Sequence, residues 1–161
     1  MDCKSNIGIG RKLQKPVGHG IIGADQAPAS GEQRSEAMKK IHTDSAPAAV
    51  GPYSQAYVAG DFLFASGQIA LDPASGALRG DTVEAQTEQA IRNLQAVLEA
   101  AGSNLDRVIK TTCFLRRMSD FAAFNAIYAR FFPGKPARSC VEVSALPKGA
   151  LVEIEAVAEI A

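Results

Sequence analysis

The sequence predicts a two-layer α+β domain, in which two helices pack on one face of a mixed β-sheet. Two observations support this fold class. From residue 41 onward, segments typical of strands and helices follow one another in the order β-β-α-β-α-β-β. Each of the two predicted helices has a single apolar stripe, so it can bury only one side. The helices can therefore cover one sheet face, which leaves the other face to solvent or to neighbouring subunits.

The first half of the domain is predicted to be a hairpin followed by a helix. Two β-prone runs, 53–58 and 62–66, are separated by Ala59-Gly60-Asp61, a typical hairpin turn. A helix is expected to begin near Asp81 as N-cap, with Glu84 completing a capping box, and to end at Gly102. Its apolar residues recur at helical spacing: Ala90, Ile91, Leu94, Val97, Leu98 and Ala101.

The second half is predicted to be a strand, a helix and two further strands. Residues 108–115 are rich in β-branched side chains, and Ser119 is the expected N-cap of the helix that follows. That helix has an apolar stripe made of Phe121, Phe124, Ile127, Tyr128 and Phe131, and it ends before Pro133-Gly134. The last two strands are expected over 137–143 and 151–160. Apolar residues such as Val143 and Val157 on the uncovered face favour an oligomer.

Alternation in the last two strands predicts where chemistry could reside. Arg138 and Cys140 fall on one side of the first strand, and Glu153 and Glu155 fall on one side of the second. If the strands are neighbours, these side chains share the face away from the helices. A guanidinium on a rigid strand suits a substrate carboxylate, and a nearby carboxylate can activate water. The alternative, which spacing alone favours, is a surface ion pair of Arg138 with Glu153 or Glu142.

Composition excludes several other classes of site. Seventeen basic residues balance seventeen acidic ones, so no global charge attracts nucleic acid or anionic lipid. No apolar run is long enough to span a bilayer, and the sequence is typical of a cytoplasmic protein. The cysteines (Cys3, Cys113 and Cys140) and the histidines (His19 and His42) are too scattered for a disulfide framework or a metal site, and none is expected.

The first forty residues differ in character from the rest of the chain. They contain seven basic and four acidic residues, no aromatic residue and no apolar periodicity. Residues 41–161 contain ten basic and thirteen acidic residues together with all the strand and helix patterns. We therefore expect residues 1–40 to be a disordered or loosely attached extension and residues 41–161 to be the folded domain.

Five motifs in series resemble the Rid family of reactive intermediate deaminases, also called the YjgF-type or imine deaminase family. The motifs are Gly51-Pro52-Tyr53-Ser54-Gln55, Ser66-Gly67-Gln68-Ile69, residues 108–115, residues 136–143, and Leu146-Pro147-Lys148 followed by residues 152–156. They occur in order between about residue 41 and residue 161, so the resemblance covers the predicted domain and excludes the extension.

The resemblance implies a chorismate-mutase-like fold and a homotrimer, in which the sheets form a central barrel and the sites lie between subunits. It implies hydrolysis of enamines and imines, such as 2-aminoacrylate, to a 2-keto acid and ammonia, with no cofactor. By motif position, Arg138 would bind the substrate carboxylate and Glu153 would orient the attacking water. The remaining matched residues would line the cleft or hold the ligand: Tyr53, Gly67, Asn125 and Cys140.

Two other functions compete with deamination. A cleft with one arginine could bind 2-keto acids without turnover, as a small-molecule binding or regulatory protein would. Some family members have been called ribonucleases, but the negative charge of residues 41–161 and the lack of a basic stripe disfavour nucleic-acid binding. The presence of Arg138 favours the deaminase interpretation.

Overall fold

The computed structural model describes residues 38–160, which form part of one compact unit over residues 35–161. The predicted extension therefore lies almost entirely outside the described residues. The first strand, β1 (Lys39–Ile41), begins just before the expected domain start at residue 41. No helix within residues 38–160 is long and apolar enough to cross a membrane.

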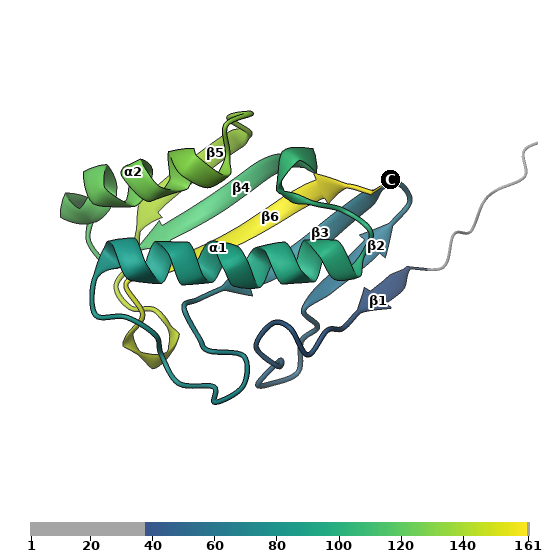
Figure 1. Ribbon diagram of the computed structural model, residues 1–161, viewed down its shortest axis with the longest axis horizontal. Coiled ribbons are helices and arrows are strands. Elements are labelled where there is room, and N and C mark those ends of the chain that lie inside the picture. Colours follow the sequence, from purple (N-terminus) through teal and green to yellow (C-terminus); the bar gives the residue numbers. More distant parts are fainter. Residues whose placement is uncertain (1–37, 161) are drawn as a thin grey trace, which may run out of the picture. The chain divides into compact units, whose positions relative to one another are not determined.

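A six-stranded sheet in the order β1-β2-β3-β6-β4-β5 forms one layer of the described domain (Figure 1). Its other strands are β2 (Ala56–Ala59), β3 (Phe62–Gln68), β4 (Val108–Leu115), β5 (Ala137–Glu142) and β6 (Val152–Glu159). β2 and β3 form the predicted hairpin, with Gly60 at φ +57° in the turn. Neighbouring strands are antiparallel except for β4 and β5, which are parallel.

Two helices, α1 (Val83–Ala100) and α2 (Phe121–Phe131), form the second layer and lie on the same face of the sheet (Figure 1). The predicted two-layer α+β fold is therefore confirmed. α2 connects β4 to β5, and this helical crossover is what allows the two strands to run parallel. Three short 3₁₀ turns complete the described domain: Leu105–Arg107, Met118–Asp120 and Pro147–Gly149.

Both predicted helix starts were wrong by one residue. Thr82, not Asp81, is the N-cap of α1, and its Oγ1 accepts a hydrogen bond from the Ala85 amide at 3.3 Å. Glu84 is consequently one position too early to complete a capping box. Ser119 lies inside the 3₁₀ turn that leads into α2, so Asp120 takes the N-cap position. The predicted end of α1 is confirmed, because Gly102 has φ +81° directly after the C-cap.

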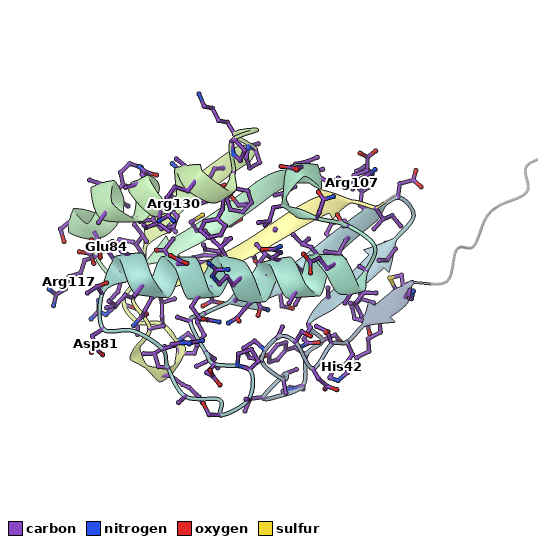
Figure 2. All side chains as sticks on the ribbon, in the orientation of Figure 1. His42, Asp81, Glu84, Arg107, Arg117 and Arg130 are labelled. Atoms are coloured by element: carbon purple, nitrogen blue, oxygen red, sulfur yellow. The ribbon has the colours of Figure 1, made fainter. Side chains whose placement is uncertain are left out.

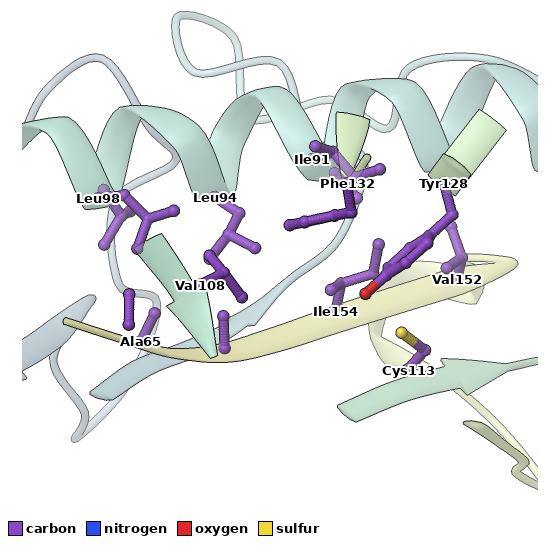
Figure 3. Packing of buried hydrophobic residues seen from close by; sticks show 14 of the residues in the cluster. Ala65, Ile91, Leu94, Leu98, Val108, Cys113, Tyr128, Phe132, Val152 and Ile154 are labelled. Atoms are coloured by element: carbon purple, nitrogen blue, oxygen red, sulfur yellow. The ribbon is translucent and has the colours of Figure 1, made fainter. Parts of the chain in front are cut away.

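The core lies between the helices and the sheet, and β6 supplies its centre. Val152, Ile154, Ala156 and Ala158 are buried, and the residues between them are only partly buried, as the alternation predicted. The apolar stripe of α1 packs on these residues through Ile91, Leu94 and Leu98 (Figure 3). Burial on this side stabilises the domain by about 25 cal/mol per Å² of apolar surface removed from water.

The opposite face of the sheet has no covering layer in the described chain. Tyr57, Phe64 and Val157 are paired across β2, β3 and β6, so their side chains share this face. Tyr57 is 41% exposed and Phe64 is 50% exposed. Val141 on β5 adds a further apolar side chain, 42% exposed, on the same side. An apolar surface of this kind is typical of a face that another chain covers.

The expectation that Arg138 and Cys140 share a face with Glu153 was wrong. β5 and β6 are not neighbours, because β4 lies between them. Across the three strands, Cys140 pairs with Cys113 and Cys113 pairs with Ile154, which faces the core. Cys140 and Arg138 therefore lie on the helix side of the sheet, whereas Glu153 lies on the uncovered side.

Candidate active site

A cavity of about 560 Å³ opens where β3 and β6 meet the loops that precede β2 and β6. Among its lining residues are three that the sequence singled out: Tyr53, Gly67 and Glu153. We call these three residues the acid half-site. The cavity also contains Lys148, whose Nζ donates a hydrogen bond to the Gly76 carbonyl at 2.7 Å and so ties the rim to the turn before α1.

Glu153 lies directly over the backbone of Gly67. The pairing of β3 with β6 shifts between Ala65 and Gln68, and this irregularity brings Gly67 against the Glu153 side chain. A Cβ atom at residue 67 would overlap the Glu153 carboxylate, and it would lie 2.9 Å from its Cγ. The close approach of the Glu153 side chain therefore favours glycine at residue 67, and no positive φ is involved.

The environment of Glu153 makes its carboxylate a stronger base than that of an ordinary glutamate. Burial raises the pKa of Glu153 above its ordinary value, and the neighbouring Glu155 carboxylate raises the pKa further. Among residues 38–160, neither carboxylate forms an ion pair within 4.0 Å. A carboxylate without a cationic partner keeps its oxygens available for a water molecule.

Replacing Gly67 with alanine is expected to displace the Glu153 carboxylate without unfolding the domain. The clash involves only the Cγ, Cδ and Oε1 atoms of the flexible Glu153 side chain and no backbone atom, so the side chain can rotate away at little cost in stability. If Glu153 orients the attacking water, as the sequence resemblance implies, turnover of 2-aminoacrylate should fall about 10- to 100-fold, because misplacing a catalytic group by about 1 Å can cost around a hundredfold in rate.

The control for this variant is Gly134→Ala. Gly134 has open space around its Cα and no positive φ, so an added methyl group meets nothing. Circular dichroism melting should give similar midpoints for both variants, and only Gly67→Ala should lose activity. Equal activity of the two variants would contradict a role of the Glu153 carboxylate in turnover.

Tyr53 lies at the rim of the cavity and is 49% exposed. Its hydroxyl oxygen accepts a weak hydrogen bond from the Val50 amide at 3.4 Å. The loop that carries it is fixed by Gln55, which is 2% exposed. The Gln55 side-chain amide donates to the carbonyls of Thr43 at 3.0 Å and Pro47 at 2.9 Å, and its Oε1 accepts from the Thr43 amide at 2.8 Å.

Sequence reasoning missed these buried amides as parts of the site. Besides Gln55, Asn93 of α1 donates to the carbonyls of Ile69 and Leu71 at 3.0 and 2.8 Å, and so holds the chain along the cavity wall. One available signal was that Asn93 falls within the predicted apolar stripe of α1, between Ile91 and Leu94. A polar residue in such a stripe must find a hydrogen-bond partner inside the protein.

Arg138 lies on the other side of the sheet, at the β5 edge, together with Asn125 and Cys140. We call these three residues the arginine half-site. The Nη1 atom of Arg138 donates a hydrogen bond to Asn125 Oδ1 at 2.8 Å. Within the described residues, Arg138 forms no ion pair, so neither the Arg138–Glu153 pair nor the Arg138–Glu142 pair exists. The Glu142 carboxylate instead accepts from the Met118 amide at 2.6 Å.

The two described cysteines are unsuited to be nucleophiles. Cys113 is buried in the core, and burial raises the pKa of its thiol to about 12. Burial also raises the pKa of Cys140, although Arg138 acts in the opposite direction. His42 lies just after β1, at the opposite edge of the sheet from Cys140 on β5, so these two residues form no Cys–His pair (Figure 2).

The chain alone brings together the members of each half-site but does not bring the two half-sites together. The acid half-site faces the uncovered side of the sheet, and the arginine half-site faces α2 at the sheet edge. The first presents the Glu153 carboxylate and the second presents the Arg138 guanidinium, two groups of opposite charge.

The chain shows clear similarity to known proteins. The family described as Endoribonuclease L-PSP matches residues 43–160. The solved structure of YyfA from Yersinia pestis, described as a member of the conserved Rid protein family, is 49% identical, with a TM-score of 0.75, and the match covers 77% of this chain and 100% of that one. The chain belongs to the Rid family.

Other Rid family members have been named in different ways. A RutC family protein of Synechocystis is 56% identical over 124 residues, a match that covers 75% of this chain and 95% of the relative. The Escherichia coli protein TdcF, solved with bound serine, is 40% identical, with a TM-score of 0.73, and the match covers 76% of this chain and 99% of that one. A further relative, from Lactococcus lactis, is named as a regulator, AldR, and the matching family is described as an endoribonuclease, so the family membership does not by itself name the reaction.

Proposed function

We propose that this Rid family protein hydrolyses enamines and imines of small 2-amino acids, such as 2-aminoacrylate, to 2-keto acids and ammonia. The observation that carries the proposal is the chemistry of the two half-sites. Arg138 has no carboxylate partner among the described residues. Glu153 lines the cavity, its pKa is raised, and it forms no ion pair with any described residue. A free guanidinium and a poised base are the groups that hydrolysis of a carboxylate-bearing imine requires.

The proposed active form is a homotrimer, in which each site combines the acid half-site of one subunit with the arginine half-site of the next. The exposed apolar residues on the uncovered sheet face support this assembly: Tyr57, Phe64 and Val141. The opposite placement of the half-sites supports it as well, because a cyclic arrangement puts unlike surfaces of successive subunits in contact.

In the proposed reaction, Arg138 holds the substrate carboxylate through two hydrogen bonds. The enamine first takes a proton on its terminal carbon and becomes an iminium ion. Glu153 then accepts a proton from water as the water oxygen bonds to the iminium carbon and the carbon–nitrogen π electrons move to nitrogen, which gives a neutral tetrahedral amino alcohol. The protonated Glu153 passes that proton to the nitrogen, the carbon–nitrogen bond breaks, and the hydroxyl proton leaves through Glu153 to the departing ammonia. The products are a 2-keto acid and ammonium, and Glu153 is again ionised. Water is the nucleophile, and the step uses no metal or cofactor.

The proposal is tested by ammonia release from 2-aminoacrylate that a pyridoxal-phosphate enzyme generates in the same cuvette. Purified protein is expected to accelerate the appearance of ammonia and pyruvate well above the spontaneous rate. The control is the same generating enzyme with Arg138→Ala protein at equal concentration. A rate equal to that in buffer, with folded protein present, would overturn the proposal.

Binding without turnover is the second candidate function. The TdcF structure with bound serine and the Lactococcus lactis relative named as a regulator favour it. Under this function the protein would bind pyruvate or serine in calorimetry but would not accelerate the release of ammonia. The ammonia assay therefore separates the two candidates.

A further inference from the structure

We propose that Tyr128, fixed by Thr111, is a positioning residue that holds the Arg138 guanidinium in place for an anionic substrate. The inference rests on the proposed function, since it concerns how Arg138 binds a carboxylate. It adds Tyr128 and Thr111, which belong to neither half-site, to the residues on which substrate binding depends.

The guanidinium of Arg138 is surrounded by aromatic rings from α2. Its Cζ atom lies 4.7 Å from the centroid of the Tyr128 ring, which is the nearest of three. Phe121 and Phe124 follow at 5.6 and 5.7 Å. All three distances lie within the range of an attractive cation–π interaction. The arginine side chain is therefore held against α2 by ring faces and by its hydrogen bond to Asn125.

This mode of holding differs from a salt bridge in one functional respect. A carboxylate partner would fix the guanidinium but would also neutralise it and compete with a substrate carboxylate. Ring faces and a side-chain amide carry no net charge, so they restrict the arginine and leave its charge available. A side chain that is already ordered loses less conformational entropy when the substrate binds.

Tyr128 is itself held in a defined orientation. Its hydroxyl is 2.7 Å from Thr111 Oγ1, and Thr111 is fully buried on β4. Thr111 is also the residue paired with Arg138 in the β4–β5 ladder. Figure 3 shows the Tyr128 ring reaching from α2 toward the sheet. The hydrogen bond between the two hydroxyl groups thus fixes the Tyr128 ring to Thr111, the β4 residue that is paired with Arg138.

The chain offers a matched control for the loss of this ring. Phe132 is buried and stacks on Tyr128 with ring centroids 4.4 Å apart, but it does not contact the guanidinium. Tyr128→Leu and Phe132→Leu each replace one aromatic ring of the same cluster with an apolar side chain. Both variants should lose stability, and only Tyr128→Leu removes the ring nearest to Arg138.

The experiment measures pyruvate affinity by calorimetry and the steady-state kinetics of imine hydrolysis for the full-length chain. Tyr128→Leu is expected to weaken pyruvate binding and raise KM by about tenfold with a smaller change in kcat, because the guanidinium loses both its nearest ring and the order that this ring imposes. Phe132→Leu should bind pyruvate like the wild type. Tyr128→Phe, which keeps the ring but loses the hydroxyl group, should lie between the wild type and Tyr128→Leu, with a loss of a few fold.

The role of Thr111 is tested by Thr111→Val and by the double variant with Tyr128→Phe. Each single change removes one side of the hydroxyl bond, so we expect similar losses of a few fold and no further loss in the double variant. Equal pyruvate affinity of wild type and Tyr128→Leu would overturn the positioning role while leaving the proposed function intact. If the wild type bound no pyruvate, the assignment of Arg138 in the proposed function would fail first.

Discussion

Replacing Arg138 with alanine is expected to reduce kcat/KM for 2-aminoacrylate by roughly a hundredfold to ten-thousandfold. Charge-assisted hydrogen bonds contribute about 1.5–3 kcal/mol each, and two of them are proposed to orient the substrate carboxylate. Arg138→Lys keeps the charge but loses the planar fork, so it should recover little of the rate. The measurement is ammonia release under steady-state conditions over a range of substrate supply.

The fold should survive the loss of Arg138. Its side chain is exposed at the sheet edge and forms no ion pair within residues 38–160, so thermal midpoints should change little. Arg130→Ala, which removes an exposed arginine of the neighbouring helix α2, is the control for a general effect of charge (Figure 2). Wild-type turnover by the Arg138→Ala variant would contradict the proposal that Arg138 binds the substrate carboxylate.

The Glu153→Gln variant is expected to lower kcat by about a hundredfold to ten-thousandfold, the range typical of a lost general base. Pyruvate affinity should change much less, because glutamine keeps the shape of the side chain and the anion is held by Arg138. The measurement compares single-turnover rates with calorimetric affinities. A parallel loss of binding and rate would assign Glu153 to substrate binding instead.

The pH profile gives a second readout for Glu153. Because burial and Glu155 raise the pKa of Glu153, the base becomes protonated at a higher pH than an ordinary glutamate would. The acidic limb of the rate profile should therefore lie above the normal glutamate range and should vanish in Glu153→Gln. Glu155→Gln removes the neighbouring negative charge and should move that limb to lower pH.

The Glu153→Gln variant is expected to lose activity without losing free energy of unfolding. A carboxyl group with a raised pKa in the folded state stabilises the fold below its unfolded pKa, and this contribution is lost as pH rises through the folded value. At neutral pH, an ionised Glu153 therefore costs folding free energy, and Glu153→Gln should be at least as stable as the wild type.

The layers of the fold could be predicted from the sequence because the patterns in β6 and α1 are strong. The alternation around Ile154 and the stripe around Leu94 each assign one buried side, and both sides are buried as expected. The N-cap of α1 was misplaced because Asp81 and Thr82 are both good caps, and their choice depends on the local backbone.

The relation between Arg138 and Glu153 could not be predicted from alternation. Alternation shows which residues of one strand share a side, but it does not show which strands are neighbours in the sheet. The helical crossover through α2 places β5 beside β4 in parallel, and this long-range pairing puts Arg138 on the helix side. Likewise, the aromatic stripe of α2 predicted a core contact, and it also supplies the rings that hold Arg138.

The central claim is that each site takes Arg138 from one subunit and Glu153 from another. It is tested most directly by mixing two inactive variants, Arg138→Ala and Glu153→Gln, and letting their subunits exchange. In a mixed trimer, one of the three interfaces pairs an intact Arg138 with an intact Glu153. Native mass spectrometry with one variant mass-tagged confirms the mixed species before the assay.

Random exchange of equal amounts is expected to restore about a quarter of the wild-type ammonia release per subunit, since three-quarters of the trimers are mixed and each contains one intact site. A control mixture of Arg138→Ala with the double variant should stay inactive. Mixed trimers that remain as inactive as either parent would contradict a site shared between subunits.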